Sequence, residues 1–135
     1  MVQWKDEFSV GYEKFDEQHK ELINILNSLG DIIKDKELHP DLFYDKVSNI
    51  LNQILDYTEY HFKSEEEVFE EKGYEYTEEH KESHETFVIN VKDEVAKFQL
   101  GKDQRKVAKD IYDTLVKWLF KHIMGEDKKY MNKLD

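Results

Sequence analysis

Four stretches of the chain repeat apolar residues at intervals of three or four positions, which is the spacing of one face of an α-helix. No stretch of comparable length alternates apolar and polar residues in the way that a half-buried strand does. The pattern therefore predicts an all-α protein. We expect its helices to cover residues 16–36, 41–71, 77–100 and 104–128.

The residues between these stretches are typical of helix boundaries. Asp16 and Thr77 are predicted N-caps, because their side-chain oxygens can accept a bond from a free backbone N–H. Pro40 suits the first turn of a helix, and Gly73 and Gly101 favour helix ends. The connections are short, so neighbouring helices should be antiparallel. The prediction is an up-down-up-down antiparallel four-helix bundle.

Residues 1–15 mix aromatic and charged side chains without a clean helical period. Trp4, Phe8 and Phe15 are the largest apolar side chains of this segment. We predict an N-terminal arm that lies across the core and contributes to its packing.

Length and composition favour one folded domain over residues 1–135. Hydrophobic residues make up 39% of the chain and aromatic residues 13%, so the chain can form a core. There is no cysteine, which excludes thiolate zinc sites and iron–sulfur clusters. Any metal ion must therefore be held by nitrogen and oxygen atoms.

The formal net charge of −11 argues against nucleic acid and anionic membranes as partners. No segment approaches the roughly 20 apolar residues of a membrane span, and residues 1–15 lack the apolar core of a signal peptide. We expect a cytoplasmic monomer. The glutamates of 65–71 are expected to form a solvated face, except for Glu65 on the apolar side.

Histidines and two carboxylates lie on the apolar helix faces at spacings that suit metal binding. His80 and His84 are four residues apart, one turn apart on one helix face, and His61 and Glu65 repeat that spacing. His39 stands beside Pro40 and is expected at the surface. The candidate metal ligands are His19, His61, Glu65, His80, His84, His122 and Asp127.

An up-down-up-down bundle brings all seven candidates to one end of the core. A single histidine on an apolar face is more often a hydrogen-bonded core residue than a ligand. Two buried carboxylates without partners would cost several kcal/mol, about the penalty for an unpaired buried charge. A metal centre removes that cost, so the set as a whole predicts a metal site.

His122 and Asp127 are five residues apart, and an ideal α-helix would not put them on one face. We therefore predict that the last helix changes there to a π-type turn or ends. Gly125 is expected to permit this change.

The seven side chains exceed what one tetrahedral ion needs, and they suit two ions. If both carboxylates bridge and a solvent oxygen bridges too, one position of two octahedral ions stays open. An open position on a redox metal suits a small-molecule ligand. Nitrogen-rich ligation with carboxylate bridges favours iron, ahead of manganese or zinc.

The whole pattern resembles the hemerythrin family of non-haem di-iron oxygen-binding bundles, in its bacterial form. That family has a lone His, then HxxxE, HxxxH and HxxxxD, which match the candidate ligands listed above. The flanking segments around Trp4 and around Trp118 agree as well, so the resemblance spans nearly all of the chain.

The resemblance implies a site of two iron ions joined by an oxo or hydroxo bridge. His80, His84 and His122 would hold the filled iron, and His19 and His61 the open one. Glu65 and Asp127 would bridge. O2 would bind at the open iron and be held there as hydroperoxide, reversibly.

By position, the family's oxygen pocket falls on five apolar residues. The pocket should be closed and apolar to keep water and protons from bound oxygen. The pocket residues so implied are Leu22, Phe62, Trp118, Leu119 and Met124.

Several functions use such a site. The first hypothesis is a binding protein for O2 carriage, storage or delivery, which could serve an O2-consuming enzyme. An O2, NO or redox sensor with a signalling partner is the main alternative. A di-iron oxidase or peroxidase is disfavoured, because five imidazoles stabilise high-valent iron less well than carboxylates. Iron storage suits a two-ion closed site poorly.

Overall fold

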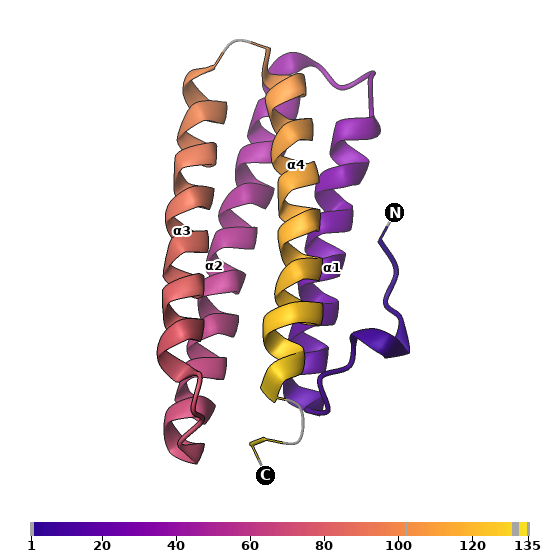
Figure 1. The fold of residues 1–135 in the computed structure, drawn as a ribbon. Helices are drawn as coiled ribbons and strands as arrows, with labels where there is room; N and C mark the ends of the chain where they lie inside the picture. The colour runs from indigo at the N-terminus through magenta and orange to yellow at the C-terminus, as the bar shows by residue number, and fades with distance from the viewer. Residues whose placement is uncertain (1, 102, 131–132, 135) are drawn as a thin grey trace.

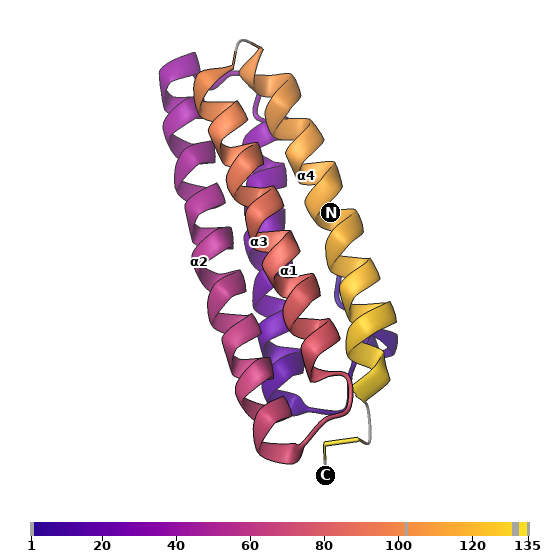
Figure 2. The same ribbon diagram turned by 60° about the vertical axis from the view of Figure 1, so that its left-hand side comes forward.

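A computed structural model describes residues 2–101, 103–130 and 133–134, and it is all-helical over those residues. The four long helices are α1 (Glu13–Lys34), α2 (Pro40–Lys72), α3 (Thr77–Leu100) and α4 (Gln104–Lys121). They form the predicted antiparallel bundle, which Figures 1 and 2 show from two sides. The fold class predicted from the apolar pattern is confirmed.

Helix α4 is continued by a π-helical segment, η2 (His122–Glu126), and then by a 3-10 turn, η3 (Asp127–Tyr130). The predicted change of helix type between His122 and Asp127 is therefore confirmed. Neither a positive φ nor a close contact requires glycine at position 125, since a Cβ there would meet nothing within 4 Å. The wider π turn alone brings both side chains to the core side.

The N-terminal arm packs along α1 and α4, as expected. Phe8, in the 3-10 turn η1 (Asp6–Phe8), is buried, and its ring lies 5.1 Å from the ring of Phe120. The backbone of Val2 exchanges two hydrogen bonds with the side chain of Asn27 on α1, at 2.9 and 2.8 Å. The arm therefore contacts both helices, and Figure 1 shows it running beside α1.

Two predicted N-caps are corrected by the structure. Helix α1 begins at Glu13, so Asp16 lies inside its first turn and accepts bonds from the Ser9 hydroxyl (2.5 Å) and the Val10 N–H (2.8 Å). Thr77 is the first residue of α3, and its hydroxyl donates to the carbonyl of Tyr74 at 2.6 Å. In both cases the helix begins earlier than predicted, with Tyr12 and Tyr76 at the capping positions, and the side chain bonds to the preceding segment instead.

Two further boundaries follow the expectation. Gly73 ends α2 in the left-handed region, with φ of 65°. His39 is exposed, and its ring accepts a bond from the N–H of Asp41 at 3.2 Å, so it caps α2. No helix in the described part of the chain is long and apolar enough to cross a membrane.

Candidate metal centre

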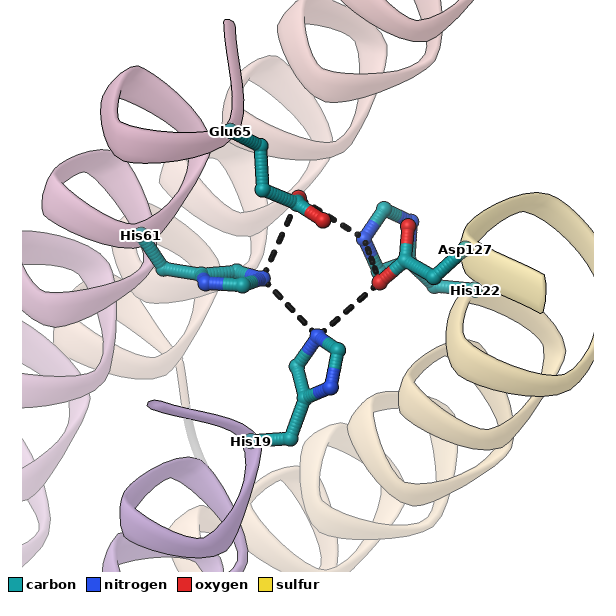
Figure 3. Close-up of side chains that lie close together, drawn as sticks. All are labelled: His19, His61, Glu65, His122 and Asp127. Carbon is teal, nitrogen blue, oxygen red and sulfur yellow. Dashed lines mark hydrogen bonds and ion pairs between the residues drawn. The ribbon is translucent and has the colours of Figure 1, made fainter. Parts of the chain in front are cut away.

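The start of α1, the end of α2, the start of α3 and the segment after α4 lie at the same end of the bundle (Figure 1). Each contributes one or two of the predicted ligands. The side chains of His19, His61, Glu65, His122 and Asp127 offer ligand atoms that all lie within 4.8 Å of one another. Figure 3 shows these five side chains pointing to a common centre from three helical elements and η3.

Glu65 lies between histidines of three helical elements. Its Oε1 is 3.1 Å from Nε2 of His61, 3.4 Å from Nε2 of His84 and 3.5 Å from Nε2 of His122. All four residues are buried. The Glu65 carboxylate therefore faces histidines on both sides of the cluster.

Asp127 is placed in the same way on the opposite side. Its Oδ2 is 2.9 Å from Nε2 of His19 and 3.0 Å from Nε2 of His122, and its Oδ1 is 3.3 Å from Nε2 of His80. The structure thus brings all seven sequence-predicted ligands to one buried cluster. All five imidazoles present Nε2 to a carboxylate oxygen.

Several atoms at the centre have no hydrogen bond of their own. Among the described residues, Glu65 Oε1, Asp127 Oδ2, His84 Nε2 and His122 Nε2 are buried and make none. Buried polar atoms rarely stay without partners, and here they are nitrogen and oxygen donors aimed at one another. Metal ions would satisfy them, so the donor set and its geometry fit a di-iron site and are consistent with iron binding.

Burial raises the pKa of both carboxyls, and the charge of Glu65 raises the pKa of Asp127 further. The surrounding imidazoles outweigh these effects, chiefly His61 for Glu65 and His122 for Asp127, so the pKa of each carboxyl is lowered. Burial also tends to lower the pKa of His122, yet the carboxylate of Asp127 holds it well above the ordinary value. Both carboxylates are therefore ionised and ready to bind cations.

The outer faces of the histidines are held by residues that sequence reasoning missed. Nδ1 of His61 lies 2.6 Å from Oε1 of Gln18, and Nδ1 of His84 lies 3.1 Å from Oε2 of Glu66. Nδ1 of His122 lies 3.2 Å from Oε2 of Glu126. Such outer partners fix the ring orientation of metal-binding histidines. Glu66 was expected on a solvated face, and its contact with His84 corrects that expectation.

Apolar residues surround the cluster. Leu22, Trp118 and Leu119 line a narrow internal cavity together with residues of α1, α2, α3 and α4. The ring of Phe62 stacks on His84 at 3.8 Å and lies 5.6 Å from the ring of Trp118. Four of the five expected pocket residues therefore lie beside the site or in the cavity wall.

Met124 lies apart from the other four expected pocket residues. Its side chain is 42% exposed, and it is absent from the wall of that cavity. The π turn that points His122 and Asp127 inward also buries Ile123 but leaves Met124 and Gly125 exposed.

Comparison with known proteins agrees with the geometry. The family described as the hemerythrin HHE cation binding domain matches residues 10–134. A bacteriohemerythrin of Clostridium acetobutylicum is 33% identical over 132 residues, covering 98% of this chain and 100% of the relative. A myohemerythrin of Theromyzon tessulatum is 34% identical, covering 98% and 92% of the two chains.

A solved structure agrees as well. The crystal structure of a wild-type hemerythrin superposes with a TM-score of 0.83 at 28% identity, covering 99% of this chain and 98% of the other. On the matched family and on these relatives, the chain belongs to the hemerythrin family.

Proposed function

We propose that this chain binds two iron ions and, through them, binds O2 reversibly as an oxygen carrier, store or delivery protein. The observation that carries the proposal is the position of the two carboxylates. The resemblance assigns His19 and His61 to one iron and His80, His84 and His122 to the other. Each carboxylate lies between histidines of these two groups, which is the placement that bridging requires. Residues 1–135 would act as one domain.

In this proposal His80, His84 and His122 hold one iron, while His19 and His61 hold the other. Glu65 supports this division, because its Oε1 approaches His61 of one set and His84 of the other. Asp127 also supports it, because it approaches His19 as well as His80 and His122. The iron pair would supply the electrons and the open coordination position.

The surrounding residues would keep water and protons out. Leu22 and Leu119 are 3% and 2% exposed and face the same cavity as Trp118. An apolar wall next to the site strengthens electrostatic interactions inside it and slows protonation of a bound reduced ligand. The small negative charge of five imidazoles and two carboxylates favours binding over oxidation chemistry, so we propose no enzymatic turnover.

The test is the visible spectrum of the reduced, iron-loaded protein as O2 is admitted and then withdrawn. We expect two irons per chain and a charge-transfer band that appears with O2 and disappears without it. Irreversible conversion to a ferric form would overturn reversible binding and point to oxidase chemistry or to a redox sensor.

Ligand variants test the site itself. Glu65→Ala and His61→Ala should each lose most of the bound iron, because each variant removes one of the seven side chains proposed to hold the two ions. His39→Ala is the matched control, since His39 is exposed and precedes the start of α2, whereas His61 and Glu65 lie in the later half of that helix. Iron content that stays full in the Glu65→Ala variant would exclude the carboxylate as a bridge.

A further inference from the structure

The outer partners of the histidines differ in charge from one side of the cluster to the other. On one side, carboxylates accept from His84 and His122: Glu66 at 3.1 Å and Glu126 at 3.2 Å. Because Nε2 of each ring faces the cluster, the neutral ring carries its proton on Nδ1 and donates it to the carboxylate. Both of these histidines belong to the group of three that is proposed to hold one iron.

His19 and His61, the histidines proposed for the other iron, have weaker outer partners. His61 places Nδ1 2.6 Å from the amide oxygen of Gln18, which is neutral. His19 has no hydrogen-bond partner for Nδ1 among the described residues. Neither ring has a carboxylate on its outer face in the contacts that the structure describes.

The carboxylate of Glu126 is held in place from a second helix. The hydroxyl of Ser83, on α3, lies 2.9 Å from Oε1 and 2.8 Å from Oε2 of Glu126. Glu126 itself is in the π-helical segment, four residues after His122. The π segment and α3 therefore fix the acceptor on the outer edge of the His122 ring.

The chemical consequence follows from how an imidazole responds to its acceptor. A carboxylate draws the Nδ1 proton more strongly than an amide oxygen does, and this increases electron density at Nε2. A more basic Nε2 stabilises an ion of higher charge. Two of the three histidines on one side would have this property, while the two on the other side would not.

We propose that Glu66 and Glu126 are positioning residues that make the two irons unequal, so that the iron of His80, His84 and His122 is the one more easily oxidised. The other iron, with Gln18 behind His61, would keep the lower charge. The inference rests on the proposed function, since it needs an iron at each position. It extends that function by assigning the order in which the irons change oxidation state.

The experiment measures the one-electron midpoint potentials of the iron-loaded full chain by spectroelectrochemistry. Glu126→Gln and Glu66→Gln keep the side-chain shape and remove the charge. Each should weaken the preference for the ferric ion on that side by about tenfold, which for one electron is about 59 mV. The step that moves should be the one at lower potential, and it should move upward.

Two further variants separate this effect from others. Glu67→Gln removes the same charge from an exposed neighbour of Glu66, so it controls for net charge alone. Gln18→Glu places a carboxylate behind His61 and should lower the potential of the other step. Iron-loaded Glu126→Gln or Glu66→Gln protein whose potentials match those of Glu67→Gln would overturn the inference.

The failures of the two proposals are distinguishable. A wild-type chain that takes up fewer than two irons overturns the proposed function and this inference with it. A chain that takes up two irons, binds O2 reversibly and shows no response to the Glu126 or Glu66 variants overturns this inference alone. Iron content measured in every variant separates these outcomes.

Discussion

The hydroxyl of Tyr130 donates a hydrogen bond to Oε2 of Glu65 at 2.8 Å, deep inside the protein. Both side chains are fully buried. Burial and the nearby charge of Glu65 raise the pKa of Tyr130 well above its ordinary value, so the hydroxyl stays protonated and remains a donor. The bond ties η3 to α2 and leaves Oε1 of Glu65 directed at the histidines.

Removing that donor should cost stability. We expect Tyr130→Phe to lower the free energy of unfolding of the metal-free protein by about 1.5–3 kcal/mol, the range for hydrogen bonds to charged groups. Tyr74→Phe is the matched control, because the buried hydroxyl of Tyr74 has no hydrogen-bond partner in the described structure. Urea unfolding measures both, and equal losses in the two variants would contradict the assigned role of the bond.

Asp16 gives a second prediction, on the arm. Because its carboxylate accepts from Ser9 and from the Val10 N–H, Asp16→Ala should release the arm while α1 stays intact. Hydrogen exchange should show faster exchange of the Val10 amide, with helical circular dichroism unchanged. Glu13→Ala removes an exposed acid from the same helical turn and should leave the arm protected. Loss of helix content in Asp16→Ala would instead favour the capping role.

The sequence predicted the fold and the clustering of the seven candidate ligands for a physical reason. Apolar spacing reports which side of a helix is buried, and short connections report how helices are ordered. Together they place His19, His80 and Asp127 at one end without any knowledge of contacts. The five-residue spacing of His122 and Asp127 was enough to predict the π turn.

The outer partners could not be found in this way. Glu66 and Gln18 lie next to ligands in sequence, so they point about 100° away from them around the helix and reach histidines of other helices. Which acid of a charge run makes such a contact depends on the rotation and the spacing of two helices. The exposure of Met124 could not be predicted for a related reason, since sequence spacing does not report on which side of a π turn the intervening residues lie.

The raised pKa of His122 makes the unfolding free energy of the metal-free protein depend on pH. A histidine whose pKa is raised by folding stabilises the folded state fully below its ordinary pKa of 6.5, and this contribution is lost as the pH rises through the raised value. The pKa of buried His61 is lowered, which acts in the opposite sense and below pH 6.5. We therefore expect the unfolding free energy to fall as the pH rises above about 6.5.

The slope of that fall is limited to about 1.4 kcal/mol per pH unit for one proton. Urea unfolding of the metal-free wild type at several pH values measures it, and His122→Asn should remove it. His39→Ala controls for a histidine outside the cluster. A metal-free wild type whose stability is flat over this range would show that His122 gains no proton affinity on folding.

Gly73 and Gly125 differ in whether the backbone conformation requires glycine. Gly73 has a φ of 65°, where a side chain is strained, so Gly73→Ala should lower the unfolding free energy by about 1–2 kcal/mol. Gly125 does not have a positive φ and has open space at its Cβ, so Gly125→Ala should leave stability unchanged or raise it by about 0.4–1 kcal/mol. Urea unfolding and iron content check both variants. A loss of iron in Gly125→Ala would mean that the π turn between His122 and Asp127 needs the freedom of glycine after all.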